Sequence, residues 1–282
     1  MKLTVLADNN TYIDQYYLGE PAVCYLLEDG DEQFLFDLGY SDVYLKNAQA
    51  MGLNLSNIRT LVFSHGHNDH TGGLAYLPPA FTGSRIVGHP NLLEPKKGGG
   101  VSISSPVSAD DLSGSFRLQL SREPQKLSDH IWFLGEIPRH FPFENKKAVG
   151  LRYVRGQWEP DYVRDDSALV LLVSDGIFIV TGCSHSGICN IIRYAKQVTR
   201  CSHVMGVIGG FHLFDEDVEQ TARTAAYFQE EGLAQLYPCH CTSLQAKLHL
   251  AEKLPLREVG VGLQLIWDER DGSFRELRGM AE

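Results

Sequence analysis

Three histidines and an aspartate fall within six positions of this chain, in the segment His65-Gly66-His67-Asn68-Asp69-His70. His65 and His67 are two residues apart, so on extended backbone their side chains point the same way and can bind one metal ion. Asp69 and His70 come where Thr71-Gly72-Gly73 lets the chain turn into a helix, so they face a second point nearby. The segment predicts half of the ligands for two adjacent metals, in preference to a histidine-rich surface loop or a single structural zinc.

Length and composition are those of a globular protein with a large core. The 282 residues are 43% hydrophobic and 21% charged, so one domain over residues 1–282 is the economical interpretation. The net charge of −10 argues against a nucleic acid as partner, because nucleic-acid-binding proteins usually carry a basic stripe. We therefore expect a small-molecule substrate.

The sequence gives no sign of a membrane segment or of secretion. It contains neither a signal peptide nor an apolar run long enough to span a bilayer, so we expect no membrane partner and a cytoplasmic location. The six cysteines lack the spacing of a disulfide framework and are expected to be reduced. The oligomeric state stays open.

Two stretches share one pattern, in which an apolar strand, an Asp-Gly pair and a second apolar strand lead to a potential ligand. The first stretch covers residues 23–37 and ends at Asp37, and the second covers residues 169–183 and ends at Cys183. A helical pattern follows each, over residues 43–51 and 188–198. This weak internal duplication predicts two sheet-plus-helix halves stacked face to face, with the helices outside.

Further elements follow from hydrophobic periodicity and capping signals. Strands are expected at residues 60–63, 85–88, 131–135, 203–208, 233–237 and 262–267, and helices at 217–231 and 243–254. Residues 94–112 differ, because Lys96-Lys97-Gly98-Gly99-Gly100 runs into several serines and Pro106. That composition is typical of a mobile loop, which is either a simple surface connection or an active-site lid.

Three later histidines, His185, His212 and His240, follow apolar strands at positions where a sandwich would gather its loops. Each is weak evidence alone, but together with residues 65–70 they indicate one shared metal site. His212 is also interpreted as a donor to a substrate oxygen or developing oxyanion, or as a packed histidine that closes a strand. Cys239 and Cys241 flank His240, would point away from it on an extended strand, and are expected to pack in the core.

With these motifs the chain resembles the metallo-β-lactamase superfamily. The resemblance rests on residues 65–70, on the strand end Gly182-Cys183 and on the late His240, and it extends over nearly the whole chain. It implies an αββα sandwich of the α/β class with a dinuclear metal site at one edge. Asp8-Asn9, residues 181–188, Gly209-Gly210-Phe211-His212-Leu213 and His240-Cys241-Thr242 resemble the subgroup named after 7,8-dihydropterin-6-methyl-4-(β-D-ribofuranosyl)aminobenzene-5'-phosphate synthase.

The resemblance implies a role for each candidate ligand. His65 and His67 would hold the first metal, and Asp69, His70 and His240 the second. The superfamily usually has a bridging aspartate where this chain has Cys183, and a third histidine where it has Arg164-Asp165-Asp166-Ser167. We infer that His185 binds the first metal instead, and Cys183 is left to bridge, to bind one metal or to line the pocket. The metals are two divalent ions, with zinc expected first and manganese or iron as alternatives.

The expected activity is hydrolysis by a hydroxide held between two metals, with Asp69 and His212 as the catalytic residues. The resemblance suggests a small, phosphorylated or pterin-like substrate, joined through a phosphoester, ester or lactone. Asp8, Asn9 and Arg139 are the candidate substrate-pocket residues, Arg139 for an anionic group. The alternatives are a synthase that joins a pterin diphosphate to an aminobenzene ribofuranosyl phosphate, di-iron redox chemistry, and a ligand-sensing metalloprotein without catalysis.

Overall fold

The computed structural model describes residues 1–144, 146–215, 218–268 and 271–279, whose strands form three sheets. The largest has eight strands, in the order β18 (Phe274–Arg278), β17 (Leu263–Trp267), β1 (Lys2–Ala7), β2 (Cys24–Asp29), β3 (Glu32–Phe36), β4 (Thr60–Val62), β5 (Arg85–Gly88) and β8 (Arg117–Leu120). The second has six, in the order β16 (Gln235–Pro238), β15 (Val204–Gly209), β14 (Gly176–Thr181), β13 (Ala168–Val173), β10 (Ile131–Phe133) and β9 (Gln125–Lys126). The third has four, in the order β12 (Gln157–Pro160), β11 (Leu151–Val154), β6 (Lys96–Gly98) and β7 (Val101–Ser102).

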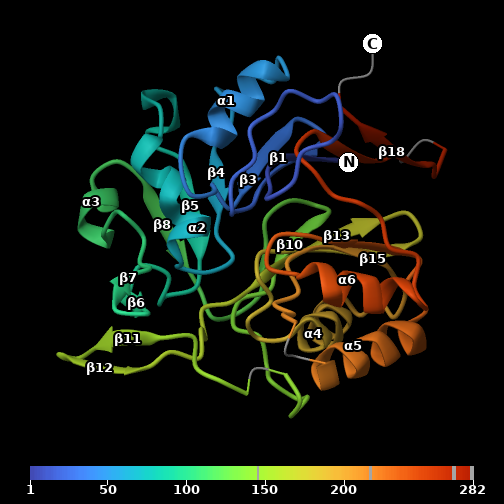
Figure 1. Cartoon of the computed structure of the whole chain (residues 1–282). Coiled ribbons are helices and arrows are strands. Elements are labelled where there is room, and N and C mark those ends of the chain that lie inside the picture. The colour runs from blue at the N-terminus through green and yellow to red at the C-terminus, as the bar shows by residue number, and fades with distance from the viewer. Residues whose placement is uncertain (145, 216–217, 269–270, 280–282) are drawn as a thin grey trace.

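Helices cover the outer faces of the two large sheets (Figure 1). Helix α1 (Val43–Ala50) packs on the eight-stranded sheet, and α4 (Ile188–Thr199), α5 (Val218–Glu231) and α6 (Leu244–Ala251) pack on the six-stranded sheet. The shorter helices are α2 (Asn68–Thr71), α3 (Ala109–Ser113), η1 (Gly72–Tyr76) and η2 (Pro79–Phe81). The layers therefore run helix, sheet, sheet, helix, as the sequence predicts.

The alternation of side chains along the strands builds this layering. In β3, Phe34 and Phe36 face the other sheet, whereas Leu35 packs toward α1. In β14 the even positions, Phe178 and Val180, fill the space between the sheets, and the odd positions pack beneath α4. Successive residues of a strand point to opposite faces, so the side chains of a strand that is apolar throughout pack into two hydrophobic cores, one on each face of the sheet.

The predicted internal duplication is present. Strands β2 and β3 form an antiparallel hairpin, α1 follows, and β4 lies parallel to β3. Strands β13 and β14 form the second hairpin, α4 follows, and β15 lies parallel to β14. Both turns lie one position away from the predicted Asp-Gly pairs: Asp29 pairs with Glu32, so the first turn is Gly30-Asp31, and Val173 pairs with Gly176, so the second is Ser174-Asp175. Gly176 lies in the strand, where a Cβ would meet the carbonyl oxygen of His203 at 2.4 Å.

Residues 94–112, predicted as a mobile loop, contain regular secondary structure. The segment contains β6, β7 and α3, and β6 pairs with β11. Lys96 is buried, and Asn68 N–H donates to the carbonyl oxygen of Ile103 at 3.0 Å. The glycine-rich composition suggested mobility, but these glycines form the turn of the β6–β7 hairpin. The ion pairs of Lys96 with a distant segment hold this hairpin in place.

The remaining sequence expectations agree with the structure to within a few residues. Strands β8, β9, β11, β12 and β18 were not expected from the periodicity, because they are short or lie largely exposed. All six cysteines are free, as predicted. In the described part of the chain, no helix combines the length and apolar character needed to cross a membrane.

Candidate metal centre

The end of β4 and the start of α2 place the first four candidate ligands. His67 has extended backbone (φ −74°, ψ 152°) at the N-cap of α2, and the single turn of α2 then carries Asp69 and His70. Gly66 lets the chain pass close to a neighbouring loop, because a Cβ at this position would lie 1.9 Å from the carbonyl oxygen of Leu92. The local conformation therefore delivers the two pairs of ligands to two adjacent points, as the spacing predicts.

His65, His67 and His185 form one cluster. His65 Nε2 lies 3.0 Å from His67 Nδ1, and the His185 ring centroid lies 4.7 Å from that of His65 and 5.0 Å from that of His67. One potential ligand atom from each of the three lies within 4.8 Å of the others. The loop after β14 thus brings His185 to the two histidines of the α2 segment.

The protonation of this cluster suits metal binding. Burial, followed by repulsion from neighbouring imidazoles, lowers the pKa of His65 and of His185 well below the usual value. Burial lowers the pKa of His67 to about 4, so the three rings are neutral near pH 7, the form that binds metals. His67 Nε2 is buried and has no hydrogen-bond partner among the described residues, a state that is costly unless a ligand is bound.

Asp69, His70, Cys183 and His240 form the second cluster. Asp69 Oδ2 lies 3.5 Å from His70 Nε2 and 3.3 Å from His240 Nε2, and His70 Nε2 lies 3.1 Å from Cys183 Sγ. Burial raises the pKa of Asp69, but His70 and His240 outweigh burial and lower the pKa well below the usual value. The ring centroids of His65 and His70 are 4.1 Å apart, so the two clusters share an edge.

Asp37 supports His70 and does not join either cluster, although its place at the end of β3 made it a potential ligand. Asp37 Oδ2 lies 2.7 Å from His70 Nδ1 and accepts from Ser64 Oγ at 2.7 Å. A carboxylate only accepts, so His70 Nδ1 carries the proton and Nε2 is directed at the second cluster. The same carboxylate accepts from Ser64 N–H at 2.8 Å, which ties β3 to the start of the histidine segment.

Two buried aspartates each hold one of the loops that carry the candidate histidine ligands. In the sequence they stood out only because they replace the third histidine that the resemblance implies. Asp165 Oδ2 accepts from Gly66 N–H at 2.8 Å, between His65 and His67. Asp166 Oδ2 accepts from the backbone N–H of Ser186 at 2.8 Å, next to His185. Where the resemblance led us to expect a third histidine, the chain therefore has two residues that position the histidines present.

Lys96 completes this support. Its Nζ lies 3.0 Å from Asp165 Oδ1 and 3.2 Å from Asp161 Oδ2, and all three side chains are buried. Burial raises the pKa of Asp165, but the charge of Lys96 more than compensates and lowers the pKa below the usual range. The β6–β7 hairpin is thus joined through one cation to the backbone between His65 and His67.

Asp8 and Asn9, predicted as substrate-pocket residues, both contact His240. Asp8 Oδ2 accepts from His240 N–H at 3.2 Å, and this aspartate is buried. Asn9 Oδ1 lies 3.2 Å from His240 Nδ1, and Asn9 Nδ2 donates to the His240 carbonyl oxygen at 3.3 Å. The amide oxygen accepts the Nδ1 proton, so His240 Nε2 is directed at Asp69.

His212 lies beside the first cluster, and Arg139 does not. The ring centroids of His212 and His185 are 4.3 Å apart, and both side chains line a cavity of about 450 Å³. Arg139 Nη2 donates to the carbonyl oxygens of Tyr162 and Val163, at 2.6 and 3.1 Å, and lines a different depression with Glu136 and Arg164. Arg139 therefore does not line the cavity beside His185 and His212 as it is described, and its role toward a substrate stays a prediction.

Four residues of the candidate metal centre have a strained backbone. Asp37, Ser184, His212 and His240 all have φ between +47° and +59°, where a residue other than glycine costs on the order of 1–3 kcal/mol. The conformation at His240 also breaks the alternation expected of a strand. Cys239 packs in the core, as predicted. Cys241 does not: its Sγ donates to the Cys183 carbonyl oxygen at 3.5 Å.

The buried Glu144 gives a pH-dependent contribution to stability. Its carboxylate accepts from Cys189 N–H and Asn190 N–H, both at 2.9 Å, at the start of α4. Burial raises the pKa of Glu144 from 4.5 to about 7. The folded protein therefore retains a proton that the unfolded chain releases above pH 4.5, so this contribution is present at low pH and is lost as the pH rises toward 7.

We expect Glu144→Gln to flatten the pH dependence of stability, because glutamine keeps the size of the side chain and cannot ionise. Between pH 5 and 7 the free energy of unfolding of the wild type should fall by on the order of 1–3 kcal/mol relative to the variant. Urea titrations of both proteins at three pH values measure this difference. Parallel profiles for the two proteins would show that Glu144 does not titrate in this interval.

The comparisons with known proteins agree with this geometry. A family model described as the metallo-beta-lactamase superfamily matches residues 18–197. The chain is 29% identical over 262 residues to the 7,8-dihydropterin-6-methyl-4-(beta-D-ribofuranosyl)-aminobenzene-5'-phosphate synthase of Methanocaldococcus jannaschii, and the alignment covers 88% of this chain and 89% of that protein. An uncharacterized protein of the same archaeon is 28% identical over 253 residues, which cover 89% of this chain and 94% of that one.

Solved structures show the same fold. Tm1679, described as a metal-dependent hydrolase of the beta-lactamase superfamily, is 27% identical with a TM-score of 0.83, covering 94% of this chain and 98% of that one. The metallo-beta-lactamase fold protein YhfI from Bacillus subtilis has a TM-score of 0.56 at 14% identity, covering 93% of this chain and 98% of its own. Because the family model spans more than half of the residues and the fold agrees throughout, the chain belongs to the metallo-beta-lactamase superfamily.

Proposed function

We propose that this protein is a metal-dependent hydrolase of a small molecule that carries a phosphoester, ester or lactone. The observation that carries the proposal is the pair of candidate ligand clusters, which adjoin each other where the ring of His65 lies against that of His70. Nitrogen, oxygen and sulfur donors in such sets suit two divalent cations, with zinc first and manganese or iron next. The six free thiols support action in the cytoplasm.

Each cluster has a distinct part in this proposal. His65, His67 and His185 would hold one ion, and Asp69, His70, Cys183 and His240 the other. Two divalent ions bound by these residues would supply a water-derived nucleophile near neutral pH and would polarise the scissile bond. Asp37 and Asn9 fix the Nδ1 protons of His70 and His240, which leaves the Nε2 atoms of both rings directed at the second cluster.

His212 is proposed to act on the substrate. Its ring lies against His185, outside both clusters, and lines the adjoining cavity. A histidine at this position can donate a hydrogen bond to a substrate oxygen on which negative charge develops. Asp69, which lies between His70 and His240, is the second proposed catalytic residue, because its ionised carboxylate can orient the nucleophile and accept its proton.

A synthase is the second candidate, because a relative that aligns over 88% of this chain is named as one. The two reactions use the same ligands and differ in the acceptor, which is water in hydrolysis and an aminobenzene derivative in synthesis. Incubation of a pterin diphosphate with an aminobenzene ribofuranosyl phosphate tests this candidate. A coupled product and pyrophosphate identify a synthase, whereas pterin alcohol and pyrophosphate without coupling identify a hydrolase.

Removal of metal tests the proposal as a whole. We expect a chelator to abolish hydrolysis across a panel of phosphoesters, esters and lactones, and zinc or manganese to restore it, because the proposed nucleophile depends on bound metal. Elemental analysis should find two metals per chain. Hydrolysis that persists in metal-free protein, or tight ligand capture without turnover by the metal-loaded protein, would contradict a metallohydrolase.

A further inference from the structure

The cavity beside His185 and His212 has a cationic wall that the motifs did not indicate. Its volume is about 450 Å³, and its lining residues include Lys146, Lys147, Phe214 and Glu219 as well as the two histidines. Both lysines are exposed. They come from the loop between β10 and β11, far in sequence from every candidate ligand. Only the tertiary fold therefore brings their charge next to the candidate metal centre.

The loop that carries the lysines is anchored on both sides. Before them, the buried carboxylate of Glu144 accepts two backbone N–H groups at the start of α4. After them, Val149 N–H donates to the Asp161 carbonyl oxygen at 2.7 Å. Asp161 also contacts Lys96, whose other partner, Asp165, holds Gly66. The lysine segment is therefore positioned by the same network that positions the histidines.

Among the residues that the structure describes, no ion pair neutralises the positive charge of this wall. Neither Lys146 nor Lys147 forms an ion pair with any residue within the described ranges. The acidic residue of the cavity, Glu219, is paired with Arg223 at 2.9 Å. In a chain with a net charge of −10, two lysines without an ion pair among the described residues, next to the candidate metal centre, provide a local attraction for anions.

An aromatic face lies on the same cavity. The ring centroids of Phe214 and His212 are 4.8 Å apart with the rings nearly perpendicular, and Phe214 is 38% exposed. An exposed phenyl ring next to cationic groups offers a flat apolar surface to the planar part of a ligand. The cavity thus combines anion recognition with ring recognition.

We propose that the substrate carries an anionic group, a phosphate or a carboxylate, that Lys146 and Lys147 bind while a planar ring packs on Phe214. This inference rests on the proposed function, because it assigns the specificity of the same site. Lys146 and Lys147 act as specificity-determining residues: they hold the anionic end of the substrate while its scissile bond lies at the His185–His212 edge. Neutral substrates of the same shape are then poor ligands.

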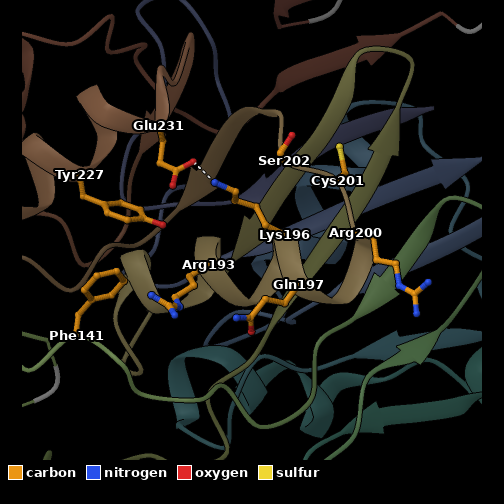
Figure 2. Close-up of a pocket in the computed structure, with 9 residues that line it drawn as sticks. All are labelled: Phe141, Arg193, Lys196, Gln197, Arg200, Cys201, Ser202, Tyr227 and Glu231. Atoms are coloured by element: carbon orange, nitrogen blue, oxygen red, sulfur yellow. Dashed lines mark hydrogen bonds and ion pairs between the residues drawn. The ribbon is translucent and has the colours of Figure 1, made fainter.

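A second basic depression supplies the matched control. It lies between α4 and α5, and its lining includes Arg193, Lys196 and Tyr227 (Figure 2). There Lys196 is already paired with Glu231 at 2.6 Å, and Arg193 lies 5.9 Å above the ring of Phe141. Because these cations have partners and none of the candidate ligands lines this depression, removal of both should not affect binding near the histidines.

Calorimetric titration of the purified, metal-loaded chain tests the proposal with three probes of one shape: benzylphosphonate, phenylacetate and benzyl alcohol. We expect Lys146→Ala/Lys147→Ala to weaken benzylphosphonate binding by about tenfold or more, and Arg193→Ala/Lys196→Ala to leave it unchanged. Benzyl alcohol should bind weakly to every variant. A larger loss for benzylphosphonate than for phenylacetate identifies phosphate as the anionic group, and the reverse identifies carboxylate.

The results separate this inference from the proposed function. Equal affinity of wild type and the Lys146/Lys147 variant for both anions, or no binding of either anion by the wild type, overturns the inference even if the protein hydrolyses esters. Loss of anion binding in that variant upholds the anion site even if no substrate of the panel is hydrolysed. Elemental analysis of each variant verifies that the metal content is unchanged.

Discussion

Substitution of Asp69 by asparagine should lower metal-dependent turnover by at least about 100-fold, since changes to groups that only support a metal ligand already cost 10–100-fold. Asp69 lies between His70 and His240, with its Oδ2 at 3.5 and 3.3 Å from their Nε2 atoms. Asparagine keeps the shape and removes the negative charge, so both the affinity for the second ion and the acceptor for a proton are lost. Steady-state kinetics and elemental analysis measure the two effects.

The fold should tolerate this change. Asp69 sits on a single-turn helix at the sheet edge, outside the hydrophobic clusters of the two sheets, so the far-ultraviolet spectrum should stay that of the wild type. Asp31→Asn, in the exposed turn between β2 and β3, is the matched control and should keep full activity. An Asp69→Asn variant that retains two metals and wild-type turnover would contradict the assignment of both catalytic roles to this residue.

Substitution of Lys96 by methionine should produce the largest loss of stability, about 3–5 kcal/mol, because it leaves two buried carboxylates without their cation. Lys96 Nζ lies within 3.2 Å of Asp161 and of Asp165, and Asp165 also holds Gly66 N–H. The free energy of unfolding from urea titration measures the loss. The affinity for the first metal should fall as well, because His65 and His67 flank the released backbone.

The pH dependence of the stability loss distinguishes removal of the Lys96 charge from the creation of a simple cavity. In the wild type the pKa of Asp165 is lower in the folded protein than in the unfolded chain. This difference stabilises the fold at pH values above the unfolded-state pKa, and the stabilisation is lost as the pH falls. In Lys96→Met, protonation of Asp165 relieves the cost of its buried, uncompensated charge, so the free energies of unfolding of the two proteins should converge toward pH 4. Lys46→Met, which breaks the exposed pair with Asp42, should change stability by less than about 0.5 kcal/mol. A constant difference at every pH would exclude the charge as the cause.

The structure adds contacts that the motifs did not indicate. Asp8 and Asn9 contact His240, and a sequence motif records which residues gather but not which way each side chain turns. Cys241 lies beside Cys183 because the positive φ of His240 rotates the chain out of the strand pattern. Residues 94–112 have the composition of a loop, but ion pairs with Asp161 and Asp165 tie Lys96 of that segment to distant residues.

What the sequence alone determined about this protein is local. The six-residue histidine segment, the two apolar hairpins and the helices that follow them depend on side chains a few positions apart, so spacing and alternation were enough to predict the layers and the two pairs of ligands. What only the tertiary structure decided are contacts between distant residues. Asp165 reaches Gly66 across 99 positions and Asn9 reaches His240 across 231. Such pairs leave no periodic signal, because their energy comes from burial and charge that exist only after the two sheets have packed together.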